Sequence, residues 1–218
     1  GWSEQKPEDW YEQTMIGMKE LLDGFDKSQV AGISFGGQMH GLVMLDENND
    51  VIRDSIIWCD QRTAAECEEI EAKIGRARLI EITANPALTG FTASKIMWVK
   101  NHEPENYAKC AHILLPKDYV RFMLTGEYAT EVSDASGMQI LDVPNRRWSD
   151  VMIKALGIKE EYLAKVYEEL EKAITRNDSK KTFEAIMDKA KGAAKVREAE
   201  KRAKTAWNEA LMNCPFSC

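Results

Sequence analysis

An apolar run that ends in paired glycines decides the fold, and it reads Val30-Ala31-Gly32-Ile33-Ser34-Phe35-Gly36-Gly37-Gln38-Met39-His40-Gly41. The apolar residues predict a short strand, and the glycines let the backbone turn sharply and approach a ligand closely. Gln38 and His40 then present hydrogen-bonding groups at the strand end, where open α/β sheets bind their ligands. The alternative is a tight turn with a partly buried histidine whose ring bonds a backbone carbonyl, and the spacing favours neither.

Helix-like and strand-like segments alternate on both sides of this run. Residues 7–21 predict an amphipathic helix, because Pro7 stands at its start and Gly24 lies just beyond its end. Residues 42–45 and 51–58 flank a polar turn and predict a hairpin. Further along the chain we expect helices over residues 63–74, 93–101, 117–124 and 149–156, and a strand over 111–115. This mixed order predicts an α/β domain with helices packed on a sheet.

A second polar cluster, Trp58-Cys59-Asp60-Gln61-Arg62-Thr63, follows a predicted strand end. The Trp58 ring could stack on the apolar face of a sugar, while Asp60 and Arg62 could hold neighbouring hydroxyls or orient each other. The alternative, which the cluster by itself favours, is that Asp60 caps the next helix beside a surface arginine.

Other charged residues of the predicted elements have a structural explanation as their default. Lys95, in a predicted helix with the apolar residues Ile96 and Val99, is expected to be solvated rather than catalytic. The carboxylates of Asp118 and Asp134 stand near element ends, where capping is the first explanation. No GxxxxGK[ST], HExxH or GxSxG motif is present.

Composition excludes several classes of protein. The 218 residues are 44% apolar and 30% charged with a net charge of -7, which supports a globular core and argues against a broad nucleic-acid surface. No apolar run approaches the roughly 18 residues of a membrane span, and the first residues lack the features of a signal peptide. Five cysteines without a CxxC pair indicate neither a disulfide framework nor a zinc knuckle. These features predict no membrane contact and a reducing, cytoplasmic location.

The charge changes sign along the chain, which predicts two segments. Residues 171–218 carry 11 basic and 7 acidic residues, whereas residues 1–170 carry 18 and 29. The apolar residues of the lysine- and alanine-rich tail recur mostly at helical spacing. We therefore expect a domain over residues 1–168 and a helical tail over 169–218.

Several motifs occur in the same order as in a known family. They are Gly1-Trp2-Ser3-Glu4-Gln5 followed by Pro7-Glu8-Asp9-Trp10, Gly37-Gln38-Met39-His40-Gly41, Trp58-Cys59-Asp60-Gln61-Arg62-Thr63, the signature-like stretch Gly90 to His102, Leu114-Leu115-Pro116-Lys117-Asp118-Tyr119, Leu124-Thr125-Gly126-Glu127-Tyr128-Ala129-Thr130 and Ser133-Asp134-Ala135-Ser136-Gly137. In this order they resemble the xylulokinases of the FGGY carbohydrate kinase family, with Cys59 where that pattern has asparagine. The resemblance ends near Glu168.

The resemblance implies a ribonuclease H-like, actin-like ATPase domain that lacks its first strands. Such domains belong to kinases that transfer the γ-phosphoryl group of ATP to a ketopentose such as D-xylulose, with Mg²⁺ bridging the phosphates. By this analogy Met39 and His40 contact the sugar, and Asp60 and Arg62 are further candidates for the same pocket.

The resemblance assigns no catalytic or metal-binding residue to this chain. The family's Asp-x-Gly-Thr phosphate motif, its general-base aspartate and its nucleotide domain match no segment here. We therefore expect a fragment that is not catalytically competent alone, with an exposed sheet edge through which two copies could pair. A non-catalytic module that binds a sugar or a partner is the alternative.

Overall fold

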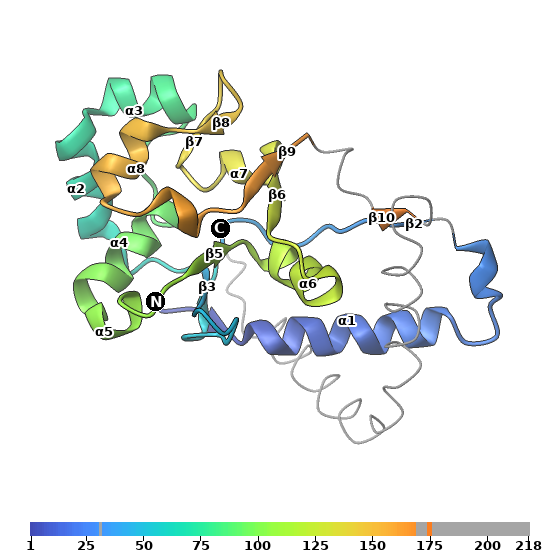
Figure 1. The fold of residues 1–218 in the computed structure, drawn as a ribbon. Coiled ribbons are helices and arrows are strands. Elements are labelled where there is room, and N and C mark those ends of the chain that lie inside the picture. Colours follow the sequence, from blue (N-terminus) through green and yellow to red (C-terminus); the bar gives the residue numbers. More distant parts are fainter. Residues whose placement is uncertain (31, 169–173, 176–218) are drawn as a thin grey trace.

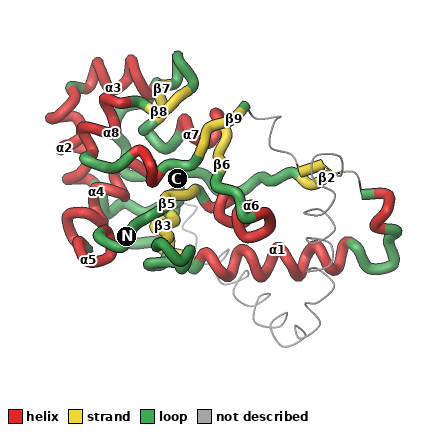
Figure 2. The backbone as a smooth tube through the Cα atoms, viewed as in Figure 1, coloured by secondary structure: helices red, strands yellow, loops and turns green. Residues whose placement is uncertain are grey.

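The computed structural model describes residues 1–30, 32–168 and 174–175, and in them short strand pairs lie among longer helices (Figure 1; Figure 2). The elements follow in the order β1 (Glu4–Gln5), α1 (Pro7–Leu21), η1 (Lys27–Gln29), β2 (Gly32–Ile33), β3 (Val43–Leu45), β4 (Ser55–Ile56), α2 (Ala64–Ile74), α3 (Arg76–Thr83), α4 (Thr92–His102), α5 (Pro104–Tyr107), β5 (His112–Leu114), α6 (Pro116–Thr125), β6 (Ala129–Glu131), α7 (Val132–Ser136), β7 (Leu141–Asp142), β8 (Arg147–Trp148), α8 (Asp150–Leu156), η2 (Glu160–Tyr162), β9 (Lys165–Tyr167) and β10 (Ile174–Thr175). The predicted mixed α/β class is confirmed.

The described strands form two-stranded ladders rather than one continuous sheet. β3 pairs with β5, β1 with β4, β2 with β10 and β7 with β8, all antiparallel, whereas β6 and β9 are parallel. The predicted hairpin is present only as isolated bridges, Leu42 to Ile56 and Leu45 to Val51. Its first strand, β3, instead makes its ladder with β5, which the local sequence pattern did not show.

The β3–β5 pair stands between two hydrophobic cores. Successive side chains of a strand point to opposite faces. Leu42 and Met44 accordingly pack into a core formed with α2, α3, α4 and α8, while Val43 and Leu45 pack into a second core with α1 and α6. Figure 1 shows α1 and α6 together on one side of the pair and α2, α3, α4, α5 and α8 on the opposite side.

The predicted helices over residues 7–21, 93–101, 117–124 and 149–156 are confirmed as α1, α4, α6 and α8. Pro7 begins α1, Gly126 ends α6 with a positive φ, and the Ser149 side chain caps α8 by accepting a hydrogen bond from Met152 N–H. The prediction that Asp60 caps the following helix is wrong. α2 begins at Ala64 and has Thr63 as its N-cap, because Asp60 bonds to other partners described below.

The predicted helical tail lies almost wholly outside the described residues. Of residues 169–218 only Ile174 and Thr175 are described, and they form the strand β10 rather than a helix. They pair with Ile33 and Gly32 of β2.

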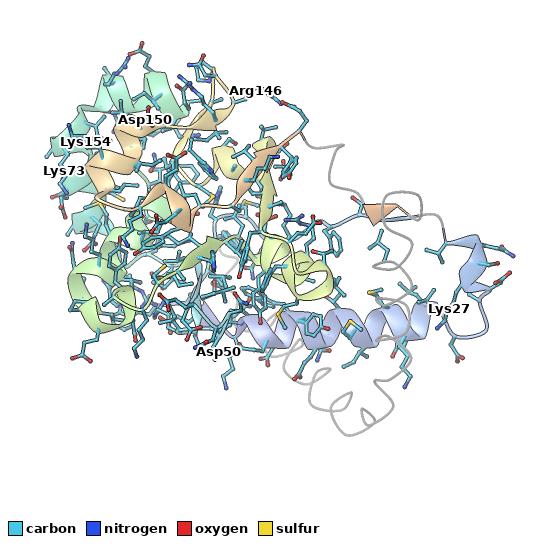
Figure 3. All side chains as sticks on the ribbon, viewed as in Figure 1. Lys27, Asp50, Lys73, Arg146, Asp150 and Lys154 are labelled. Carbon is cyan, nitrogen blue, oxygen red and sulfur yellow. The ribbon has the colours of Figure 1, made fainter. Side chains whose placement is uncertain are left out.

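Several charged residues lie on the surface of this fold. Figure 3 labels several of them, including Asp50, Lys73 and Arg146, all of which are exposed. Across the described ranges, none of the helices combines the length and the apolar character that a membrane span would need. Cys59, Cys67 and Cys110 are free thiols.

Candidate functional site

The glycine-rich loop that follows β2 crosses the N-terminus of α6. A Cβ atom at Gly37 would lie 3.2 Å from the Cβ of Lys117, and one at Gly41 would lie only 2.5 Å from Cγ of Pro116. Glycine at position 41 is therefore needed for this close approach.

His40 lies at the centre of a tight three-residue turn. Its φ is +62°, and the Gly41 N–H donates to the carbonyl of Met39 at 2.8 Å. A residue other than glycine adopts a positive φ at a cost, so surrounding contacts must hold it there. Two side chains from the first turn of α4 do so, because Thr92 Oγ1 (3.1 Å) and Lys95 Nζ (2.8 Å) both donate to the His40 carbonyl.

The imidazole of His40 is packed against Gly137 and Phe91. A Cβ atom at Gly137 would collide with the ring, and the Phe91 ring meets it edge to face with centroids 4.7 Å apart. The side chain is half-buried, and its Nδ1 is buried and completes no hydrogen bond among the described residues.

The surroundings of His40 favour the neutral ring. Burial and the nearby Lys95 lower its pKa, although a backbone interaction with Gly137 opposes them. A neutral imidazole offers one N–H donor and one acceptor, which suits a hydroxyl group. The neighbouring Met39 is 48% exposed and supplies an apolar surface beside the ring.

Asp60 and Arg62 orient each other. Asp60 is fully buried and accepts hydrogen bonds from the backbone N–H of Ser3 (2.6 Å) and from Arg62 Nη2 (2.7 Å). Burial alone would raise the pKa of Asp60, but the hydrogen bonds from Arg62 and Ser3 hold it below its usual value. The guanidinium of Arg62 lies 4.0 Å from the Trp2 ring centroid and 4.8 Å from that of Trp98. The expected surface arginine is therefore wrong, because aromatic rings and Asp60 enclose this side chain.

Lys95 was missed as a residue of this site. The expectation that it is solvated is wrong, since it is fully buried and donates to the carbonyls of His40 and Gly90, the latter at 2.6 Å. Burial lowers its pKa to about 7, Asp60 and Cys59 oppose this lowering, and Arg62 adds to it. The available signal was that α4 carries apolar residues around its whole circumference, which is typical of a buried helix.

The sequence-predicted residues thus form two linked groups. Met39 and His40 share the turn, while Asp60 and Arg62 share a buried ion pair. Lys95 connects the two groups, because it donates to the His40 carbonyl and because the charge of Asp60 opposes the lowering of its pKa by burial.

A cavity of about 330 Å³ lies on the other side of the glycine-rich loop. It is lined by Ser34, Phe35, Gly36, Gly37, Lys117, Asp118, Arg121, Thr130, Glu131, Ser133 and Asp134. In its lining, Lys117 Nζ lies 2.9 Å from Asp118 Oδ1, 3.2 Å from Glu131 Oε1 and 3.2 Å from Asp134 Oδ2.

The carboxylates around Lys117 change the acid–base behaviour of the cavity. Burial alone would lower the pKa of Lys117, but the three carboxylates raise it. Burial raises the pKa of Asp118 and of Asp134. Glu131 alone acts as a cap, accepting hydrogen bonds from the first N–H groups of α7. Capping was the expected role of Asp118 and Asp134, and the structure instead directs both of them at Lys117.

Cationic ligand groups in this cavity are already engaged. Lys117 is surrounded by carboxylates, and Arg121 donates to the carbonyl of Ala129. Among the residues described here, no group of three or more His, Cys, Asp or Glu side chains is placed to hold a metal ion.

The family profile named "FGGY family of carbohydrate kinases, N-terminal domain" matches residues 1–188. This match extends past residue 168, so the domain boundary predicted there stays a prediction. Xylulose kinase of Escherichia coli (strain K12) is 44% identical over 167 residues, which cover 77% of this chain and 34% of that protein. Xylulose kinase of Bacillus subtilis (strain 168) is 46% identical over 160 residues, covering 72% and 32%.

Solved structures show the same fold. The chain superposes on the "xyloylose kinase" from Brucella ovis with a TM-score of 0.73 and 37% identity, covering 77% of this chain and 35% of that one. Gluconate kinase from Lactobacillus acidophilus gives a TM-score of 0.72 and 25% identity, covering 76% and 34%. The chain spans about a third of the length of these relatives. Because the profile matches 188 of its 218 residues, the chain belongs to the FGGY family of carbohydrate kinases, to whose N-terminal domain it corresponds.

Proposed function

We propose that this chain supplies the sugar-binding part of a xylulokinase-like enzyme, which transfers the γ-phosphoryl group of ATP to D-xylulose or a similar ketopentose. The observation that carries the proposal is the turn at Met39 and His40. Its positive φ and its packed, neutral imidazole form a prearranged contact for a hydroxylated ligand. It occurs in a chain 44% identical to a xylulose kinase over 167 residues.

The described side chains suggest how the sugar is held. His40 can exchange one hydrogen bond with a sugar hydroxyl, and the exposed Met39 can cover the carbon chain beside it. Asp60 and Arg62 bond to each other, and Asp60 also bonds to Ser3, so neither is free to bind the sugar directly. We propose that they contribute indirectly, because the charge of Asp60 acts on Lys95.

ATP and Mg²⁺ do not fit the described residues. In the kinase reaction Mg²⁺ would supply positive charge that offsets the charge of the phosphates. The cavity beside the glycine-rich loop has three carboxylates around Lys117, and its Arg121 is bonded to a carbonyl, so it offers no open cationic surface to a triphosphate. We therefore assign no residue of this chain to either group and propose that the chain alone does not phosphorylate sugar.

Titration calorimetry and NMR with D-xylulose test the sugar contact. We expect weak, saturable binding that His40→Asn and Met39→Ala each reduce by about tenfold, since a lost contact of about 1.4 kcal/mol is a factor of ten. Asparagine tolerates the positive φ of position 40, so the first change removes the ring without forcing the turn open. Ile80→Ala, at a 39% exposed residue of α3, is the matched control and should bind as the unmodified chain does.

Two outcomes would contradict the proposal. Equal affinity of the His40→Asn variant and the unmodified chain would remove the turn from the sugar site. An ADP-release assay in which the chain turns over D-xylulose as fast as a full-length xylulose kinase would refute the proposed incompetence. Binding of a protein partner without any sugar binding would favour the alternative of a non-catalytic module.

The location and the assembly state are further parts of the proposal. Free thiols at Cys59, Cys67 and Cys110 support a reducing cytoplasm. The short ladders of the described strands leave edges at which a second copy could add a strand. Light scattering during size-exclusion chromatography would detect such a dimer as a doubled mass.

A further inference from the structure

We propose that Lys95 is a positioning residue that holds His40 in the conformation that meets the sugar. This inference rests on the proposed function for its ligand. The geometry that carries it is that one buried side chain joins the carbonyls of His40 and Gly90.

The two carbonyls belong to the two segments that fix the histidine. Bonding to His40 restrains the peptide that follows the strained residue. Bonding to Gly90 restrains the residue directly before Phe91, whose ring packs edge to face on the imidazole. Lys95 thus sets both the backbone and one wall of the ring pocket, while Thr92 adds a second hydrogen bond to the His40 carbonyl.

The environment of Lys95 suits an uncharged amine. No carboxylate forms an ion pair with it in the described part of the chain, and its two acceptors match the two N–H groups of a neutral amine. Burial lowers its pKa to about 7, so the neutral amine makes up about half of the population near neutral pH. The ionisable groups that act on it or near it are Asp60, Cys59, Arg62 and His40.

The same helix contains a matched control. Lys100, near the other end of α4, also donates to two carbonyls, those of Leu156 (3.1 Å) and Gly157 (2.9 Å). It fastens α4 to the end of α8 and makes no contact with the His40 turn. Removing either amine takes away a two-carbonyl contact, but only one of them reaches the histidine.

The experiment compares Lys95→Met with Lys100→Met in the full chain. We expect both variants to lose stability in urea, because each leaves carbonyls without a donor. Only Lys95→Met should move the NMR signals of the His40 ring beyond the spread seen between the unmodified chain and Lys100→Met. It should also weaken D-xylulose binding by about tenfold, whereas Lys100→Met should stay within about twofold of the unmodified chain.

An unshifted His40 signal in folded Lys95→Met would overturn the inference, as would equal loss of sugar affinity in both variants. If Lys95→Met does not fold, Lys95→Gln replaces it. Its amide ends one bond short of the lysine nitrogen, so we expect it to lose at least one carbonyl and shift the His40 signal, and an unchanged signal would again refute the role. If the unmodified chain binds no D-xylulose, the proposed function fails, while the NMR comparison still decides whether Lys95 positions His40.

Discussion

Two lysines contact the same glycine-rich loop, Lys95 at His40 and Lys117 at Gly37, and their surroundings are opposite. Lys95 bonds two backbone carbonyls and is fully buried. Lys117 packs against Gly37 and faces three carboxylates, with its side chain 11% exposed. The pKa of Lys95 falls to about 7, whereas that of Lys117 is raised above its ordinary value of 10.5.

The difference shows that the effect of burial on the charge of an amine is reversed where carboxylates surround it and prevails where they do not. Burial disfavours the ammonium form in both places. Around Lys117 the three carboxylates more than compensate for burial, while around Lys95 the distant charge of Asp60 does not. Near neutral pH Lys95 therefore bridges two backbone segments with an amine that is about half neutral, whereas Lys117 is a cation that holds carboxylates together.

The largest expected difference between the two lysines is in stability. Lys117→Met leaves Asp118, Glu131 and Asp134 crowded without their cation, and it should lower the free energy of unfolding by about 3–5 kcal/mol. Lys95→Met leaves unpaired carbonyls, for which about 1–3 kcal/mol is expected. Urea denaturation measures both losses. Adding Asp118→Asn to Lys117→Met removes one uncompensated charge and should restore part of the loss, and equal losses for the two single variants would contradict the contrast.

The pH dependence of stability should distinguish the two lysines, because their contributions to the free energy of unfolding change with pH in opposite directions. Between pH 7 and 10.5 the unfolded chain keeps a proton on Lys95 that the folded chain has lost. The stability of the unmodified chain relative to Lys95→Met should therefore rise across this window, by at most about 1.4 kcal/mol per pH unit. The contribution of Lys117 is fully present below pH 10.5 and is lost as the pH rises through its raised folded value.

Urea denaturation at several pH values from 7 to 11 measures these differences. Subtracting the curve of each methionine variant cancels the titration of groups that the substitution leaves alone. A difference for Lys95→Met that stays level between pH 7 and 10 would show that Lys95 keeps its proton in the folded chain.

The smallest expected effect concerns two threonines, one beside each lysine. Thr92 donates to the His40 carbonyl, so Thr92→Val should cost about 1 kcal/mol in urea denaturation. Among the described residues the hydroxyl of Thr130 has no hydrogen-bond partner in good geometry, although it acts on Asp118 and opposes the rise in pKa that burial causes there, and Thr130→Val should cost less than about 0.5 kcal/mol. Equal costs would mean that the hydroxyl of Thr130 is engaged as fully as that of Thr92.

Local patterns were sufficient to predict those elements that end in strong signals. Pro7 begins α1, which ends at Leu21 shortly before Gly24, and Ser149 and Gly157 cap the two ends of α8. The loop at Met39 and His40 was predicted in the same way, because adjacent glycines after an apolar run are visible in the sequence.

The rest depends on contacts between distant residues. Arg62 is buried because Trp2 and Trp98 cover it. Asp60 does not cap the following helix, because its side chain accepts a hydrogen bond from the N–H of Ser3, 57 positions away in the sequence. The cluster of Lys117 with its three carboxylates likewise forms only where α6, β6 and α7 come together. No periodicity in a single segment reports such meetings. The burial of Lys95 differs, because the apolar residues around the whole circumference of α4 are a local signal of a buried helix.

The strand β3 begins three residues after His40, and its alternating side chains fill both hydrophobic cores. If either hydrophobic core opens, one face of β3 loses its packing. Local unfolding of either core should therefore also destabilise the turn at His40. A ligand bound at that turn should consequently stabilise both hydrophobic cores. Its binding should slow amide exchange in the helices that pack on either side of β3.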